Sequence, residues 1–245
     1  ELPPKTEIVR TVDLSPKQVE LYEAVRAAVS REVHEEIERF GVERSKLMVL
    51  DALMKLRQVC NHPRLLKLPS AQKAKSSAKM DLLMEWLPSM VQDGRRILIF
   101  SQFTGMLDLI EEALRKEGIR FLTLTGQSKD RGQLCDDFQA GKAPVFLISL
   151  RAGGTGLNLT AADTVIHFDP WWNPALEAQA TDRAYRIGQK NPVFVYKLIT
   201  AGTIEEKILL LQQKKRALFE GILDGTPQKL SFSETELDDL LSPLK

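Results

Sequence analysis

Five short apolar runs, each separated from the next by a polar or helical stretch, constrain the fold of this chain more than any other feature. They occupy residues 96–101, 120–125, 144–149, 164–168 and 192–198. Several of these runs are apolar at consecutive positions, which is typical of strands buried on both faces of a sheet by crossover helices. Helices are expected near 103–117, 130–139 and 174–186. The sequence therefore predicts an α/β fold with a mainly parallel sheet.

Helical patterns flank this region on both sides. Ser15-Pro16 supplies an N-cap and a first-turn proline for a long amphipathic helix that reaches Phe40. A second helix is expected to begin near Leu47 and to end where Pro63 follows Asn61-His62. A third is expected to open with a capping box at Thr203-Ile-Glu-Glu206 and to run toward Phe219.

The domain organisation follows from these patterns. We predict a helical protrusion with its lead-in at 1–66, an exposed linker rich in Ser, Ala and Lys at 67–79, and an α/β lobe at 80–202. Residues 203–245 hold a C-terminal helix, which is expected to brace the sheet, and an acidic tail with leucines at helical spacing. That tail is expected to pack on its own domain, and a partner-binding segment is the alternative.

Composition excludes several classes of protein. The 245 residues carry 34 basic and 33 acidic side chains, so a nucleic-acid partner would have to be held by a local patch and not by bulk charge. No apolar run is long enough to span a bilayer, and we expect no membrane partner. Cys60 and Cys135 are far apart; with His62, Cys60 makes half a metal site at best, so we expect no metal.

Three glycines in four positions follow the third predicted strand, in the loop 149–158. Such glycines let backbone N–H groups approach a phosphate, although a plain tight turn explains them equally well. The dinucleotide fingerprint fails, because Leu159 stands where its third glycine should be. The P-loop pattern is absent too, since Gly141-Lys142 is followed by Ala143.

Gln179, Arg183 and Arg186 are spaced by four and then three residues, which would place them on one face of the expected helix. Guanidinium forks suit bidentate contact with phosphate oxygens and keep their charge at any relevant pH. The alternative is a pair of arginines tied to surface carboxylates such as Asp182 or Glu177.

Together these segments resemble the second, C-terminal RecA-like lobe of the Swi/Snf-type ATPases, which are DNA translocases of helicase superfamily two. The resemblance covers residues 14 to 208. Its motifs are Leu14-Ser-Pro-Lys-Gln18 with Tyr22, Leu56-Arg-Gln-Val-Cys-Asn-His-Pro63, Ile97-Leu-Ile-Phe-Ser-Gln-Phe103, Leu124-Thr-Gly126 with Arg131, the loop 149–159, Trp172-Asn-Pro174 and Gln179 through Gln189.

The resemblance implies an active site divided between two lobes of the same polypeptide. Lobe one would hold ATP and Mg through its P-loop and acidic residues, while this lobe would bring Arg183 and Arg186 to the γ-phosphate as catalytic arginines. Gln179, Gly154, Gly156 and Asp182 are the implied nucleotide-binding residues. The absence of a P-loop and of an initiator Met is then expected of a lobe-two segment that is inactive alone.

The resemblance also implies a face for double-stranded DNA, whose phosphate backbone would be contacted without sequence preference. The implied residues are Ser101, Gln102, Thr125, Gly126, Arg131, Ser149, Arg151, Ala152, Gly153, Thr155 and Trp172. Trp172 has a core position as its alternative role. Trp171 stands where the family often has an acidic residue, so we assign it no such contact.

Two departures from the family pattern concern the organism. Tyr185 stands where His is usual, and the segment 124–131 is shorter than usual and lacks an Asp before Gly126. The shorter segment favours bacterial members over nucleosome remodellers. The expected location is the bacterial cytoplasm with its nucleoid, or the nucleus if the source is eukaryotic.

The function expected from the resemblance is one half of an ATP-driven double-stranded DNA translocase. Two alternatives stay open: a non-catalytic nucleic-acid-binding or protein-docking module, and part of a strand-separating helicase.

Overall fold

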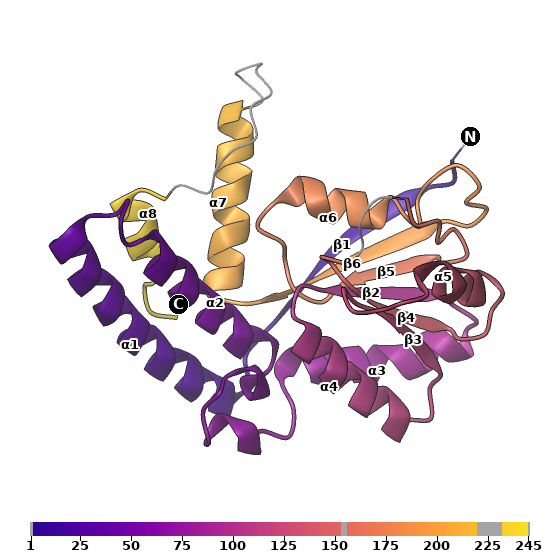
Figure 1. The fold of residues 1–245 in the computed structure, drawn as a ribbon, viewed down its shortest axis with the longest axis horizontal. Coiled ribbons are helices and arrows are strands. Elements are labelled where there is room, and N and C mark those ends of the chain that lie inside the picture. Colours follow the sequence, from indigo (N-terminus) through magenta and orange to yellow (C-terminus); the bar gives the residue numbers. More distant parts are fainter. Residues whose placement is uncertain (1, 153–155, 220–231, 245) are drawn as a thin grey trace. The chain divides into compact units, whose positions relative to one another are not determined.

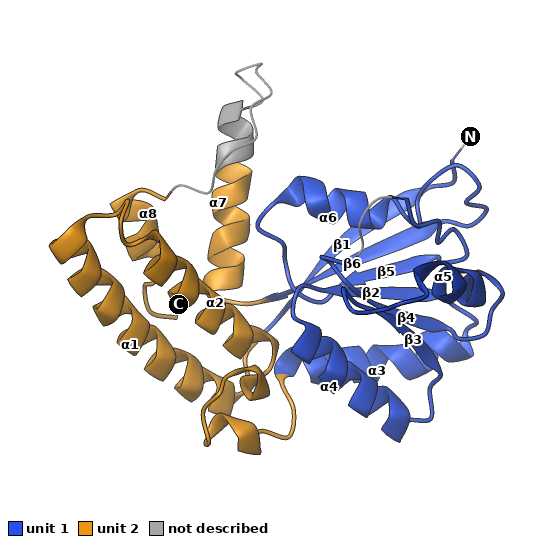
Figure 2. Ribbon diagram, in the orientation of Figure 1, with its two compact units in different colours: residues 1–12, 78–199 blue, residues 13–77, 200–245 orange. Residues whose placement is uncertain are grey.

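The computed structural model describes residues 2–152, 156–219 and 232–244. The chain divides into two compact units, which are coloured separately in Figure 2. Unit 1 comprises residues 1–12 and 78–199, and unit 2 comprises residues 13–77 and 200–245.

Unit 1 is built on a six-stranded sheet with the order β1-β6-β5-β2-β4-β3. The strands are β1 (Lys5–Val12), β2 (Ile97–Ser101), β3 (Phe121–Leu124), β4 (Val145–Ser149), β5 (Thr164–His167) and β6 (Val193–Thr200). The pairings of β6 with β5, β5 with β2, β2 with β4 and β4 with β3 are all parallel. The predicted α/β fold and all five predicted strands are confirmed.

Helices cover both faces of this sheet (Figure 1). Helices α3 (Ala78–Gln92) and α4 (Thr104–Lys116) lie on one face, and α5 (Arg131–Gln139) and α6 (Pro174–Thr181) lie on the other. Strands β2, β4 and β5 are buried along their whole length, as their unbroken apolar runs predict.

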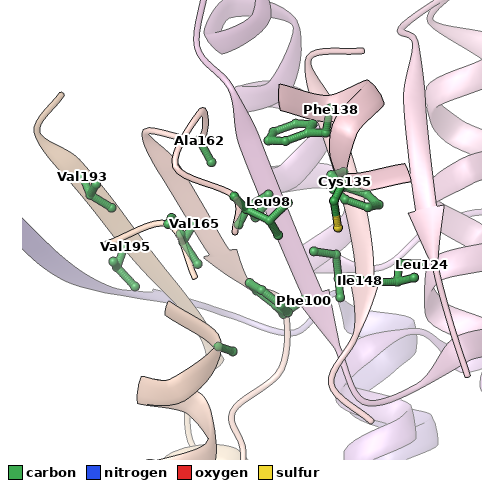
Figure 3. Close-up of a cluster of buried hydrophobic side chains, with 14 of the residues drawn as sticks. Leu98, Phe100, Leu124, Cys135, Phe138, Ile148, Ala162, Val165, Val193 and Val195 are labelled. Atoms are coloured by element: carbon green, nitrogen blue, oxygen red, sulfur yellow. The ribbon is translucent and has the colours of Figure 1, made fainter. Parts of the chain in front are cut away.

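The core between the sheet and α5 is drawn in Figure 3. Leu98, Phe100, Ile148 and Val165 come from the central strands and belong to one buried cluster with Phe138 of α5, and all five side chains are fully buried. At about 25 cal/mol per Å² of apolar surface, each such side chain contributes about 1.5–3 kcal/mol to folding. This packing fixes the sheet on which the loops described below depend.

The register brings the carboxyl ends of the central strands together. Phe100 lies opposite both Ile148 and His167, and Ile148 lies opposite Leu124. Loops that follow β2, β3, β4 and β5 consequently leave the sheet at the same edge, which is where ligands collect in parallel α/β sheets.

Unit 2 is helical. It contains α1 (Pro16–Phe40), α2 (Lys46–Asn61), the 3-10 turns η1 (Pro63–Leu65) and η2 (Ala71–Lys73), α7 (Ile204–Phe219) and α8 (Glu234–Leu240). Ser15 and Gln18 form a capping box at the start of α1. Leu237, Leu240 and Leu241 are buried, so the acidic tail packs on its own unit, as predicted. Helix α7, which was expected to brace the sheet, belongs instead to unit 2.

Three predictions about organisation are wrong. Residues 1–12 do not lead into the protrusion; they add the edge strand β1, which was missed because its side chains are mostly exposed. The predicted linker 67–79 contains η2 and ends inside α3, where Lys79 is fully buried. At α7 the Thr203 hydroxyl accepts from the N–H of Glu205, so the expected pairing with Glu206 is not formed.

The start of α7 depends on a hydroxyl from α1. The buried Tyr22 Oη accepts a 2.8 Å hydrogen bond from the backbone N–H of Ile204, which is one of the amides that a helix leaves unsatisfied at its beginning. Burial raises the pKa of Tyr22 far above its ordinary value, so the phenol stays neutral.

We predict that Tyr22→Phe lowers the free energy of unfolding of unit 2 by about 1–3 kcal/mol, because it leaves a buried N–H without an acceptor. Urea denaturation followed by circular dichroism measures the change. Tyr196→Phe is the matched control, since the Tyr196 hydroxyl has no hydrogen bond among the described residues and its ring packs against Trp86. Equal stability of the two variants would show that the Tyr22 hydrogen bond contributes nothing.

Candidate functional site

Asp169 organises the loop that follows β2. Its carboxylate accepts a short hydrogen bond from the Ser101 hydroxyl and a 3.2 Å bond from the backbone N–H of Gln102. Ser101 and Asp169 are both buried, while Gln102 is partly exposed and its side-chain amide donates to the carbonyl of Pro170. The phosphate contact expected of the Ser101 hydroxyl is not available in this arrangement, because that group supports the loop.

Lys79 contacts the segment that leads into Asp169. Its amine is fully buried and donates a 2.8 Å hydrogen bond to the carbonyl of Phe168, directly before Asp169. A buried ammonium is retained only where polar groups compensate its lost hydration. The amine thus helps to fix the residues that follow β5.

The loop after β4 begins with a second buried serine. The Ser149 hydroxyl accepts from the N–H of Ala152, and the carbonyl of Ala152 accepts from the exposed Arg131 at 3.3 Å. Arg151 is exposed. Gly156 has a φ of 97°, a left-handed conformation that favours glycine. The predicted site residues Gly153, Gly154 and Thr155 lie outside the described residues.

The loop after β3 presents Thr125 and Gly126. Thr125 is partly exposed, its backbone N–H donates to the Ser128 hydroxyl at 2.9 Å, and its own hydroxyl accepts from Gln127. Gly126 is exposed, with open space where a Cβ would be. Both residues lie at the strand edge to which they were assigned.

Helix α6 is shorter than predicted. Asn173 caps it and Pro174 begins it, as expected, but it ends at Thr181 and not near 186. In a longer helix the carbonyls of Arg183 and Ala184 would accept helical hydrogen bonds. Here the carbonyl of Arg183 accepts from the N–H of Leu159, and that of Ala184 accepts from the side-chain amide of Gln189. The expectation that Gln179, Arg183 and Arg186 share one helical face is therefore wrong.

Gln179 and Arg183 nevertheless meet. Together with Arg151 and Trp171 they line a cavity of about 280 Å³ at the carboxyl edge of the sheet. Its remaining walls are apolar and come from Phe100, Leu150, Leu176 and Ala180. Arg183 is 8% exposed, and this burial lowers the pKa of its guanidinium, which still keeps its charge at neutral pH. The cavity therefore offers cationic donors to an anion.

Other predicted site residues lie outside this cavity. Arg186 and Asp182 are exposed on the turn after α6 and are not among the residues that line it. Trp172 is partly exposed beside Trp171, so it is not a fully buried core residue. The carboxylate alternative for the arginines does not apply to Glu177, whose ion pair is with Lys197.

Sequence reasoning missed Asp169, Glu177 and Lys79. Asp169 directly follows a predicted strand, so the rule that ligands collect at the carboxyl ends of parallel strands could have found it. Trp171, which received no role, forms part of the cavity wall. The partners of Lys79 and Glu177 are distant in sequence, so no local pattern indicates them.

His167 is buried at the end of β5. Its ring stacks on Phe100 with 5.5 Å between ring centroids, and its Nε2 lies 2.9 Å from the hydroxyl of Thr181. Burial lowers the pKa of His167 to about 4; smaller effects come from Glu177, which raises this pKa, and from Lys197, which lowers it. The imidazole is therefore neutral at pH 7 and serves as an anchor for the end of α6.

Two absences concern the described residues only. They contain no group of three or more His, Cys, Asp or Glu side chains that could hold a metal ion. Within the same residues, no helix has the length and apolar character needed to cross a bilayer.

Comparison with known proteins identifies the family. Residues 78–188 match the model of the helicase conserved C-terminal domain, and residues 1–65 match that of the SNF2-related domain. The solved C-terminal domain of the Sulfolobus solfataricus SWI2/SNF2 ATPase is 32% identical, with a TM-score of 0.76 over 98% of this chain and 99% of that one. The chain belongs to the SWI2/SNF2 ATPase family.

Two further relatives extend this result. The Sulfolobus solfataricus SWI2/SNF2 ATPase core in complex with double-stranded DNA is 38% identical, with a TM-score of 0.74 over 90% of this chain and 46% of that one. YwqA, a candidate ATP-dependent helicase/translocase of Bacillus subtilis (strain 168), is 39% identical over 98% of this chain. This SNF2 C-terminal domain spans 26% of the length of YwqA.

The depressed pKa of His167 gives a testable pH dependence. The unfolded imidazole binds a proton near pH 6.5, but the folded one does so only near pH 4, so the unfolded state holds more protons between these values. The contribution of His167 to stability is therefore complete above about pH 6.5 and is lost as the pH falls toward 4. This difference in pKa between the folded and unfolded states corresponds to a contribution of up to roughly 3 kcal/mol to the free energy of unfolding.

We expect His167→Gln to flatten the decline in the free energy of unfolding of unit 1 between pH 6.5 and 4, as measured by urea denaturation at each pH. His34→Gln in unit 2 is the control, because Ser30 and Asp238 raise the pKa of His34 and the sign of its effect is opposite. An unchanged slope in His167→Gln would contradict the assignment.

Proposed function

We propose that this chain is the second lobe of an ATP-dependent double-stranded DNA translocase. The observation that carries the proposal is the cavity in which Gln179, Arg183 and Arg151 meet at the carboxyl edge of a parallel sheet. Membership of the SWI2/SNF2 ATPase family supports it, as does the DNA complex of the Sulfolobus relative. In this proposal neither lobe hydrolyses ATP without the other.

The chemistry of the cavity fits a phosphate. Arg183 supplies a charged fork in a largely apolar surrounding, where electrostatic stabilisation is stronger than in water, and Gln179 adds a neutral amide. ATP and Mg would be held mainly by lobe one, since this sequence has no P-loop. The arginines then neutralise charge that develops on the γ-phosphate, and Arg186 approaches it from the exposed turn.

The proposed DNA face consists of the loops around this cavity. Gln102, Thr125, Gly126 and Arg131 present accessible groups along the edge of the sheet, and Trp172 lies beside the cavity wall. Ser101, Ser149 and Ala152 fix the conformation of these loops through the hydrogen bond between Ser101 and Asp169 and the one between Ala152 and Ser149. Contacts of this kind recognise the sugar–phosphate backbone and carry no base sequence.

We predict that Arg183→Ala or Arg186→Ala, in the enzyme that combines this chain with lobe one, lowers the ATP hydrolysis rate by about 10³–10⁵-fold. DNA binding should change little, because these arginines face the nucleotide. Steady-state ATPase assays and fluorescence anisotropy with a duplex measure the two effects. Arg115→Ala is the matched control, since Arg115 is exposed on α4 and pairs with Glu111. Lost DNA binding with hydrolysis preserved would show that the roles are misassigned.

For Arg151→Ala we predict weaker DNA affinity on every duplex sequence alike. The slope of the logarithm of the binding constant against the logarithm of the salt concentration should become smaller by at most about one. Binding titrations at several salt concentrations measure it. Because Arg151 lines the same cavity as Arg183, the KM for ATP is measured in parallel. A raised KM for ATP with an unchanged salt slope would show that Arg151 contacts the nucleotide and not the DNA.

Two assays separate this function from its alternatives. ATPase activity that appears only when lobe one is supplied, and that rises with DNA, supports the translocase; no activity with a well-folded lobe one favours a non-catalytic binding module. Displacement of a strand from a blunt duplex would favour a strand-separating helicase.

A further inference from the structure

Glu177 joins three parts of unit 1. It lies in the first turn of α6, and only 7% of its surface is exposed. One carboxylate oxygen lies 2.7 Å from the amine of Lys197 on β6, and the other accepts a 3.2 Å hydrogen bond from the backbone N–H of Trp171. A single side chain therefore connects the helix, the sheet and the loop that follows β5.

The Glu177–Lys197 pair is largely shielded from water. Lys197 is 27% exposed and has a second, longer contact with Glu7 at 3.8 Å. A charge pair that is mostly buried costs much to break from one side, because the remaining charge has lost its hydration without compensation. This makes the carboxylate a firm attachment and not an optional surface contact.

Both proposed binding functions lie next to this attachment. The loop that Glu177 holds contains Trp171, a wall of the cavity, and Trp172, the proposed DNA contact. Two residues further along the same helix, or about 3 Å of rise, is Gln179, and the turn beyond the helix carries Arg183. The loop and the residues that line the cavity are thus joined through one side chain and one short helix.

The far end of α6 is anchored as well. The Thr181 hydroxyl donates to the carbonyl of Glu177 and lies 2.9 Å from Nε2 of His167. Helix α6 is thus tied to β6 through Lys197 and to β5 through His167. These contacts hold both ends of α6 against the sheet and attach the loop that follows β5 to its first turn.

We propose that Glu177, held by Lys197, is a positioning residue that couples DNA engagement at the Trp171–Trp172 loop to the placement of Gln179 and Arg183 in the nucleotide cavity. The inference rests on the proposed function and adds to it a route by which DNA stimulates hydrolysis. Glu177 itself is not among the residues that line the cavity.

The test measures the ratio of the ATP hydrolysis rate at saturating duplex DNA to the rate without DNA, in the enzyme that contains both lobes. A misplaced catalytic group can cost up to about a hundredfold in rate, and we expect Glu177→Gln to lower this ratio about tenfold. The glutamine can still accept from the N–H of Trp171 but cannot pair with the charge of Lys197. Glu177→Met, which removes both contacts, should lower the ratio further.

A double-mutant cycle isolates the ion pair. Lys197→Met should lower the same ratio by about as much as Glu177→Gln, and the combined variant should be no worse than either single one, because both remove the same interaction. The combined variant also leaves no unpaired buried charge, so it stays informative if a single variant folds poorly. Thermal unfolding by circular dichroism reports folding in each case.

Asp137→Asn is the matched control. Asp137 and Lys142 also lie 2.7 Å apart in unit 1, but on the surface at α5 and away from the loop of Trp171. We expect an unchanged ratio for this variant.

The outcomes separate the two proposals. A wild-type enzyme without DNA-stimulated hydrolysis would overturn the proposed function itself. Stimulation that is the same in wild type, Glu177→Gln and the combined variant would overturn the coupling role alone. A proportional fall in both rates, which leaves the ratio unaltered, would mean that Glu177 only supports the fold and would overturn the coupling role as well.

Discussion

The parallel pairing of the central strands is the constraint on which the rest of unit 1 depends. It aligns the ends of β2, β3, β4 and β5 and so gathers four loops from distant parts of the sequence at one edge. Parallel pairing in turn requires crossover helices, and these bury both faces of the sheet. The same apolar packing that stabilises the lobe therefore also creates the place where a ligand can bind.

Buried polar groups give that edge its shape. Asp169, Glu177 and Gln189 each bridge backbone or side-chain groups from separate segments, and all three are almost fully buried. A buried polar group whose hydrogen bonds are all made favours one arrangement of its neighbours. Any other arrangement would leave a buried donor or acceptor without a partner, which costs free energy. The residues that line the cavity are thus supported by buried residues that do not line it themselves.

The sequence predicts those features of the fold that arise from local patterns. Strands β2 to β6, the capped start of α1 and the proline-led start of α6 were all predicted, because each depends on residues adjacent in the chain. Strand β1 was not, since an exposed edge strand has no continuous apolar run. Lys79 was placed in a solvated linker because its partner, the carbonyl of Phe168, is 89 residues away.

The candidate site shows the same division. Gln179 and Arg183 were predicted to act together, and they do line one cavity, but the helical argument for it is wrong. Arg183 is positioned by a turn whose carbonyl accepts from Leu159, a long-range contact that helical periodicity does not indicate. The role of Glu177 was equally hidden, because its partner Lys197 belongs to the next strand.

The division of unit 1 into residues 1–12 and 78–199 has a consequence for any attempt to produce the lobe in isolation. A fragment cut at the predicted borders, residues 80 to 202, would lose β1. Strand β6 would then be an edge strand of the sheet, and its unpaired N–H and C=O groups would favour self-association. It would also discard Lys79 and with it the ammonium beneath the loop after β5. A fragment that reproduces this lobe therefore needs residues 1–12, even though residues 13–77 separate them from the rest of unit 1 in the sequence.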